Sequence, residues 1–249
     1  MNGIYDQSGF DARFDWGPDG AVALGAVSRV VIVVDVLSFS TAIEVAVSHG
    51  AAAYPSRIRD GAPTALALRV GGIETVSRTA TTPEQPFSLS PATMALARPG
   101  IKIIVASPNG AQVSLAAAES KATVLAGCFR NAAAVARAAL AIGAPIAVIA
   151  AGERWHANNA LRPSFEDLIG AGAILSALGP ISLSSEARAA LAAFHGVEND
   201  LPRALADSAS ARELASHGFG HDVSWAAERD VSTTVPIMRD GAFIDLAAA

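Results

Sequence analysis

The stretch from residue 29 to residue 41, RVVIVVDVLSFST, constrains the fold more than any other part of the chain. Residues 30–34 are four valines and one isoleucine. Such a β-branched run favours a strand that is covered on both faces, as in a parallel sheet between two layers of helices. Asp35 follows the run, and residues 42–50 then carry apolar side chains at helical spacing and end at a glycine. The stretch therefore predicts a strand, a short polar loop and a helix.

The same order recurs along the chain. Apolar runs at 101–106, 123–126 and 145–150 also lead into polar loops and helix-forming stretches. This alternation predicts an α/β fold in three layers, α/β/α, with a largely parallel sheet. It favours a single domain over residues 1–249, and a division into two sub-lobes near 150–180 stays open. The remaining segments predict an edge strand at 10–16, a turn at 17–20, strands at 51–55 and 73–77, a long loop at 78–100, helices over 183–228 and a hairpin at 235–244.

Composition excludes several classes of protein. Hydrophobic residues make up 51% of the chain and charged residues 16%, which predicts a sizeable core. No apolar run approaches the roughly 18 residues of a membrane span. The net charge of -5 argues against general nucleic-acid binding, and the one cysteine excludes an internal disulfide framework. The polar, acidic start of the chain does not resemble a secretory signal, so we expect a cytoplasmic protein, with assembly into a homo-oligomer left open.

Four polar loops follow the strands predicted to be parallel: 35–41, 107–110, 127–131 and 152–154. The carboxyl ends of parallel strands share one edge of a sheet, so we expect these loops to converge around a ligand site. Asp35 is a candidate to hold a divalent cation or to exchange a proton there. The alternative is that its carboxylate only caps the next helix.

The other polar residues of these loops are candidates to bind substrate. Hydroxyl groups could surround phosphate oxygens, an amide and a glycine could allow close approach, and an arginine could pair with an anion. Each residue also has an ordinary structural alternative, as a helix cap, a turn residue or a solvated surface side chain. The candidates are Ser38, Ser40, Thr41, Ser107, Asn109, Gly110, Arg130, Asn131 and Glu153.

A pair of acids at the start of a later helix completes the candidate set. Residues 164–167, SFED, have a capping-box pattern that accounts for Asp167 but does not require Glu166. Two adjacent acids near the converging loops could bind Mg²⁺ through a carboxylate and waters. Asp35, Glu166 and Asp167 are therefore candidates for a catalytic acid–base role or for binding a metal ion such as Mg²⁺. Gly170 and Gly172 in the same helix predict close packing against a neighbour.

Taken in order, several stretches resemble one known family. They are VVIVVDVLSFSTAIEVAVSHGA, VASPNGAQ, AGCFRNAAAVA, AAGER, SFEDLIGAGAI and GFGHDVSWAAERDVSTTVP. The chain resembles the 2-phosphosulfolactate phosphatases. The resemblance implies an α/β fold and a Mg²⁺-dependent phosphatase, linked to coenzyme M synthesis, that converts 2-phosphosulfolactate to sulfolactate and phosphate. Residues that match the family pattern are Asp35, Asn109, Gly110, Asn131, Glu166 and Asp167.

The chain departs from that pattern in three places. Ser38 stands where the family has an arginine, Arg69 stands where it has a glutamate, and Leu89 stands where it has an asparagine. Loss of an arginine beside the substrate predicts roughly ten- to a hundredfold weaker binding, hence poor hydrolysis of 2-phosphosulfolactate. If the pocket draws its charge from elsewhere, we expect Arg69, Arg130 or Arg154 to supply it. The alternative function is a catalytically inactive member of the family that binds a small anion or a protein partner.

Overall fold

Strand β2, Val30–Val34, lies between two hydrophobic clusters. The computed structural model describes residues 4–58 and 61–249. All five side chains of β2 are fully buried. Val30, Ile32 and Val34 belong to one cluster, and the two valines between them belong to the other. Successive side chains of a strand point to opposite faces, so a run without polar residues requires cover on both. The predicted buried strand is confirmed.

The other elements follow the predicted alternation of strands and helices. The strands are β1 Ala12–Trp16, β2 Val30–Val34, β3 Ala52–Ser56, β4 Ile73–Glu74, β5 Lys102–Ala106, β6 Thr123–Gly127, β7 Ile146–Ala150, β8 Glu153–Arg154, β9 Leu161–Arg162, β10 Pro236–Arg239 and β11 Ala242–Asp245. The helices are α1 Gly17–Gly25, α2 Phe39–Ser48, α3 Ala62–Val70, α4 Pro91–Met94, α5 Gly110–Ala118, α6 Ala132–Ile142, α7 Phe165–Ala177, α8 Ser185–His195, α9 Leu201–Ala206, α10 Ala209–Ser216 and α11 Gly220–Ala226.

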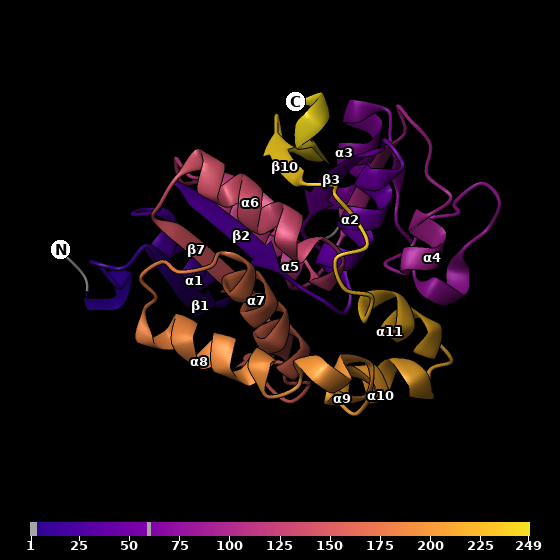
Figure 1. Ribbon diagram of the computed structural model, residues 1–249. Helices are drawn as coiled ribbons and strands as arrows, with labels where there is room; N and C mark the ends of the chain where they lie inside the picture. The colour runs from indigo at the N-terminus through magenta and orange to yellow at the C-terminus, as the bar shows by residue number, and fades with distance from the viewer. Residues whose placement is uncertain (1–3, 59–60) are drawn as a thin grey trace.

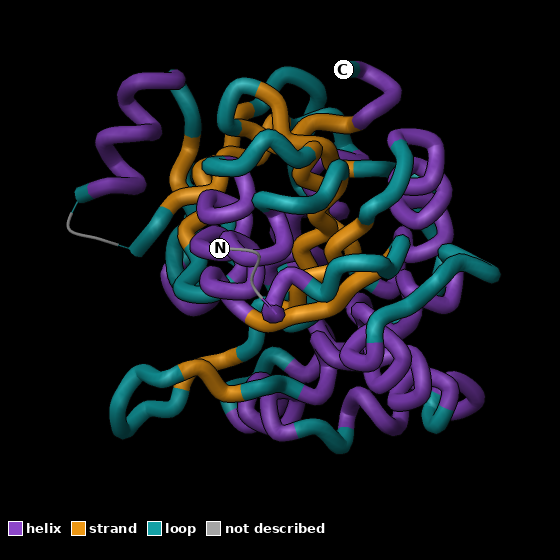
Figure 2. The backbone as a smooth tube through the Cα atoms, turned by 90° about the vertical axis from the view of Figure 1, so that its left-hand side faces the viewer, coloured by secondary structure: helices purple, strands orange, loops and turns teal. Residues whose placement is uncertain are grey.

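Helices cover both faces of the sheet (Figure 1). Helices α6, α7 and α8 contribute to the first cluster, and α1, α2 and α5 contribute to the second. Figure 2 shows the strands grouped in the centre with helices around them. The predicted α/β/α arrangement is therefore confirmed. None of the helices that the structure describes is long and apolar enough to cross a membrane.

The main sheet consists of two parallel parts joined by a hairpin. Its strand order is β1-β7-β2-β6-β10-β11-β3-β5-β4. The first four strands run parallel to one another, and so do the last three. The hairpin β10–β11 lies between them and pairs antiparallel on both sides. Its turn places Asp240 and Gly241 at φ of 49° and 82°, which suits a two-residue hairpin loop.

The expectation that β2 and β5 share one direction is wrong. Three antiparallel pairings separate them, so along the sheet β5 runs opposite to β2. A twist of about 20–25° per strand, accumulated over the five steps from β2 to β5, turns the second part of the sheet well away from the first. The loops after the two strands therefore still meet, and the backbone N–H of Gly110 lies 2.8 Å from Asp35 Oδ2.

Residues 17–20 were predicted to form a turn, but they are the first turn of α1. A proline in the first turn of a helix needs no N–H partner, and Pro18 takes that place. Gly20 lets the helix approach β1, because an added Cβ would lie 2.8 Å from Cβ of Asp15. Residues 78–100 are largely irregular, as predicted, but they also contain the short helix α4.

The close packing predicted for the glycines of α7 is confirmed. An added Cβ at Gly170 would lie 2.6 Å from Val36 Cγ2, in the loop after β2. An added Cβ at Gly172 would overlap the carbonyl oxygen of Ala190 in α8. The small side chains of α7 thus bring the loop after β2 and helix α8 close to the helix axis.

Gly172→Ala is expected to destabilise the protein, because the backbone of α8 must move to admit the methyl group. Overpacking of this kind costs about 1–3 kcal/mol, which lowers the thermal midpoint by several degrees in a chain of this size. The control is Gly196→Ala, where the backbone has φ of -65° and the nearest atom to an added Cβ is 3.4 Å away. Equal midpoints for the two variants in thermal unfolding would contradict the packing argument.

Candidate active site

Asp35 lies between the first turns of two helices. Its Oδ1 accepts a hydrogen bond from the N–H of Phe39 in α2 at 3.0 Å, and its Oδ2 accepts one from the N–H of Gly110 in α5 at 2.8 Å. Residue 110 has no room for a side chain, because an added Cβ would lie 2.6 Å from Asp35 Oδ2. The partial positive charge of both helix N-termini favours a carboxylate here. Asp35 therefore caps helices, as the structural alternative proposed, and it also lines a cavity.

Three further carboxyl groups surround Asp35. Glu166 and Asp167 are almost fully buried, and Glu153 is half-buried. Burial, with the charge of Glu166 acting in the same direction, raises the pKa of Asp35 to about 6 against the effect of its two backbone hydrogen bonds. Burial also raises the pKa of Glu153 to about 7, and the charges of Asp35 and Glu166 act in the same direction. Two carboxyl groups with pKa values near neutral pH are suited to proton transfer.

Asp167 joins two loops of the site. Its Oδ1 accepts a hydrogen bond from the N–H of Val36 at 2.7 Å. Its Oδ2 accepts from the N–H of Gly152 at 2.9 Å and from the hydroxyl of Ser164 at 2.8 Å. Burial, followed by the charges of Asp35 and Glu166, raises its pKa well above the usual value. Asp167 thus connects the loops after β2 and β7. The capping box that the SFED pattern predicts is not formed, because the side chain of Ser164 makes no cap hydrogen bond to the helix backbone and its hydroxyl donates to Asp167 instead.

The loop after β5 brings an amide beside Glu153. Asn109 Nδ2 donates a hydrogen bond to Glu153 Oε2 at 2.9 Å. Asn109 Oδ1 is buried and receives no hydrogen bond from the residues that the structure describes. Ser107 accepts a hydrogen bond from the N–H of Asn109 at 3.3 Å, which shapes the loop. This arrangement leaves one amide oxygen available to a ligand.

A cavity of about 220 Å³ opens beside these groups. The strand-end loops form one part of its wall, helix α10 forms another, and the segment 78–100 adds two residues. The contribution of α10 could not be anticipated, because its sequence predicts only a helix. The lining residues are Asp35, Leu37, Ser38, Arg78, Leu89, Ser107, Pro108, Asn109, Glu153, Ser210, Glu213, Leu214 and His217.

Arg78 is the functional residue that the sequence reasoning missed. Among the described residues that line the cavity, it is the one arginine or lysine. Its Nη2 donates to Ser38 Oγ at 2.7 Å, and its positive charge lowers the pKa of Asp35. The predicted sources of charge lie elsewhere, because Arg69 lines a different cavity and Arg154 donates to the carbonyl of Asn159. The available signal was an arginine at the start of the long irregular segment.

The hydroxyl-bearing residues at the start of α2 separate into two groups. Ser38 lines the cavity. Ser40 and Thr41 are fully buried, and their hydroxyls donate to the carbonyls of Val33 and Val36 at 3.0 and 2.8 Å. Ser40 and Thr41 therefore bind the backbone around the end of β2, and neither residue lines the cavity.

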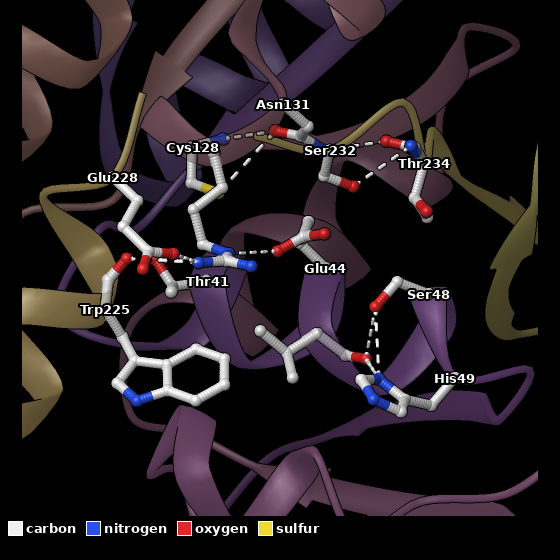
Figure 3. Close-up of polar contacts among 12 residues, drawn as sticks. Thr41, Glu44, Ser48, His49, Cys128, Asn131, Trp225, Glu228, Ser232 and Thr234 are labelled. Carbon is white, nitrogen blue, oxygen red and sulfur yellow. Dashed lines mark hydrogen bonds and ion pairs between the residues drawn. The ribbon is translucent and has the colours of Figure 1, made fainter. Parts of the chain in front are cut away.

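Arg130 and Asn131 lie in a different polar cluster. Figure 3 labels Asn131, Glu44, Trp225 and Glu228 of this cluster. Arg130 Nε donates to Glu44 Oε2 at 2.6 Å, its Nη1 pairs with Glu228, and its guanidinium lies 5.1 Å from the centroid of a Trp225 ring. Asn131 donates to the carbonyl of Thr234 at 3.1 Å. Neither residue lines the cavity beside Asp35. Arg130 is not a solvated surface side chain either, because it is largely buried and forms ion pairs with Glu44 and Glu228.

The donors at the cavity are of the kind that Mg²⁺ prefers, namely carboxylates and an amide oxygen without a partner. Among the described residues, no three Asp, Glu, His or Cys side chains form a ready-made metal cage. Protein-bound Mg²⁺ commonly takes one or two carboxylates and completes its shell with water and substrate. The residues therefore fit Mg²⁺ in that mode, with Asp35 and Asn109 Oδ1 as candidates from the cavity wall. Glu166 is a further carboxylate candidate that lies buried near Asp35, and neither it nor Asp167 is among the residues that line the cavity.

The fold and the cavity together define a class: an α/β protein with a small, mixed-charge ligand site at strand ends. Comparison with known proteins gives the particular family. Residues 20–241 match the family model of 2-phosphosulpholactate phosphatase, so the chain belongs to that family. A probable 2-phosphosulfolactate phosphatase of Thermotoga petrophila is 29% identical over 220 residues, covering 87% of this chain and 92% of the relative. The 2-phosphosulfolactate phosphatase of Methanothermobacter thermautotrophicus is 31% identical over 143 residues, or 57% and 58% of the two chains.

Glu166→Gln is expected to lower the rate of phosphate ester hydrolysis at least tenfold and to leave the thermal midpoint unchanged or higher. The rate should fall because the charge of Glu166 helps to raise the pKa of Asp35 and of Glu153, and the substitution removes that charge. The midpoint should not fall because Glu166 receives no hydrogen bond from the described residues that the substitution could break. Asp35→Asn should instead lose stability as well as activity, because the two N–H donors face different carboxylate oxygens and the NH2 group that replaces one oxygen cannot accept a hydrogen bond. The exposed Glu84→Gln is the control. Full activity of Glu166→Gln would remove Glu166 from the site.

The metal-free protein is expected to become less stable as pH rises from about 4 to about 7. Asp35 and Glu153 have pKa values of about 6 and about 7 in the folded state, above those of the unfolded chain. In this pH window the folded state therefore keeps protons on the two groups, whereas the unfolded chain has already released them. The free energy of unfolding therefore falls with pH. Thermal midpoints between pH 5 and pH 8 test this, and Glu153→Gln should flatten the profile. A midpoint that rises across this range would contradict the burial of these acids.

Proposed function

We propose that this protein is a Mg²⁺-dependent phosphatase that hydrolyses a small ester carrying a phosphate and a second acidic group, with 2-phosphosulfolactate as the first substrate to test. The observation that supports this proposal is the cavity, where carboxyl groups with near-neutral pKa values and one arginine surround about 220 Å³. Membership of the family supports the reaction class. On this proposal the product is sulfolactate, and a role in coenzyme M synthesis and a cytoplasmic location are expectations.

Hydrolysis joins a water oxygen to phosphorus and breaks the ester P–O bond. The attacking water gives up a proton, and the alkoxide that leaves must take one up to become the alcohol. Glu153 is suited to exchange that proton, because a pKa of about 7 leaves it partly protonated at neutral pH. Asn109 holds Glu153 Oε2 at 2.9 Å, and Oε1 receives no hydrogen bond from the described residues. The free oxygen can therefore face the leaving group while the amide fixes the carboxyl group.

The acid cluster would repel a phosphate dianion unless a cation were present. Glu166, Asp35 and Asn109 Oδ1 would hold Mg²⁺, which when bound neutralises these charges and polarises a phosphoryl oxygen. Asp167 keeps the loops in place through its three hydrogen bonds. The alternative of an inactive anion-binding relative rested on missing charge, and Arg78 provides a guanidinium at the cavity.

The test is a panel of small phosphate esters with Mg²⁺ and with a chelator. We expect hydrolysis of phosphorylated acids with Mg²⁺ only, and a loss of about 10²-fold or more in kcat for Glu153→Gln. Mg²⁺ should raise the thermal midpoint more at pH 8 than at pH 5, because protons compete for the carboxyl groups. Absence of hydrolysis across the panel with Mg²⁺ would refute the proposed phosphatase activity. Equal rates with Mg²⁺ and with the chelator would refute the proposed dependence on Mg²⁺.

A further inference from the structure

Arg78 is held in place from two distant parts of the chain. Its Nε donates to Asp222 Oδ2 of α11 at 2.7 Å. Its Nη2 donates to Ser38 Oγ at 2.7 Å and to the carbonyl of Leu89 at 3.4 Å. Asp222 is fully buried and is itself fixed by the hydroxyl of Ser90, which donates to Oδ1 at 2.5 Å. These contacts aim the guanidinium at the cavity rather than at solvent.

One end of that guanidinium remains available. Nη1 forms no hydrogen bond with the residues that the structure describes, and the side chain is 18% exposed. The guanidinium also lies 5.6 Å from the ring centroid of Phe219, which limits its movement. An arginine whose Nε and Nη2 are paired and whose Nη1 is free can donate a charge-assisted hydrogen bond from Nη1 to an oxygen of an acid group.

We propose that Arg78 binds the acidic group of the substrate that is not the phosphate, a carboxylate or a sulfonate, and that Asp222 positions it. This inference rests on the proposed function. A phosphate belongs beside the acid cluster, where a divalent cation can screen it, so a second anionic group in the same small cavity needs another cation. Among the described residues that line the cavity, Arg78 is the arginine or lysine that can supply it.

The geometry also implies that residue 38 and residue 78 share one place for positive charge. Ser38 Oγ already accepts from Arg78 Nη2, so a guanidinium carried by residue 38 would occupy the same part of the cavity. The charge in this protein therefore comes from the segment that follows β4, and a second arginine at 38 would be crowded by the first.

The experiment compares two esters that share a three-carbon skeleton. 2-Phosphosulfolactate carries a phosphate, a carboxylate and a sulfonate, whereas isopropyl phosphate carries the phosphate alone. Arg78→Ala is expected to raise KM for 2-phosphosulfolactate by roughly ten- to a hundredfold, as expected for the loss of charge-assisted hydrogen bonds, and to change KM for isopropyl phosphate less than about threefold. Arg98→Ala, at an exposed arginine of the same segment, is the control and should change neither.

Three further variants keep the test decisive if Arg78→Ala folds poorly. Arg78→Lys keeps a charge for Asp222 but loses the planar fork, and it should give a smaller rise in KM for the acid-bearing ester alone. Asp222→Asn should also raise KM for that ester with little change in kcat. Ser38→Arg should restore the Arg78→Ala variant but give no gain in the unmodified protein.

Calorimetric binding of sulfolactate to the Mg²⁺-loaded protein separates this inference from the proposed function. If no ester is hydrolysed but sulfolactate binds and Arg78→Ala weakens that binding tenfold or more, the function fails and the Arg78 site stands. If esters are hydrolysed and Arg78→Ala matches the unmodified protein, the inference is overturned. Equal losses on both esters would overturn it too, because they would place Arg78 at the phosphate or in the fold.

Discussion

The carboxylate of Asp35 carries the connection on which the site depends. It accepts one hydrogen bond from α2 and one from α5, so it joins the end of β2 to the loop after β5. These strands belong to different parallel parts of the sheet and run in opposite directions along it. Two helix N-termini offer a negative charge more stabilisation than one could. The two hydrogen bonds favour the charged form of Asp35, whereas burial disfavours that form.

The acids around Asp35 make negative charge costly at the cavity. Burial and mutual repulsion raise the pKa of Asp35, Glu153 and Asp167, each of which would be less costly to charge in water. The arrangement therefore disfavours full ionisation of these three acids in the folded protein. Perturbed carboxyl groups in a cavity are a common mark of a catalytic site for this reason.

Residues far from the strand ends complete the cavity. Helix α10 contributes part of the wall, and α11 contributes the buried Asp222 that holds Arg78. Arg130, in the loop after β6, connects helix α2 to the segment after α11 through ion pairs with Glu44 and Glu228, outside the cavity. The C-terminal helices therefore take part in the site through their packing, although their sequences show only alanine-rich amphipathic helices.

The sequence by itself determined the layers of the fold, the strand ends that carry polar residues and the acids among them. These features follow from local patterns, because a five-residue β-branched run has to be buried on both faces and a polar loop after it has to lie at an edge. The tertiary structure alone decided the direction of β5 and the place of Arg78. Strand direction depends on where the C-terminal hairpin inserts, some 130 residues after β5. The role of Arg78 depends on Ser38 and Asp222, which lie 40 and 144 residues away in the chain and meet it only through the folded backbone.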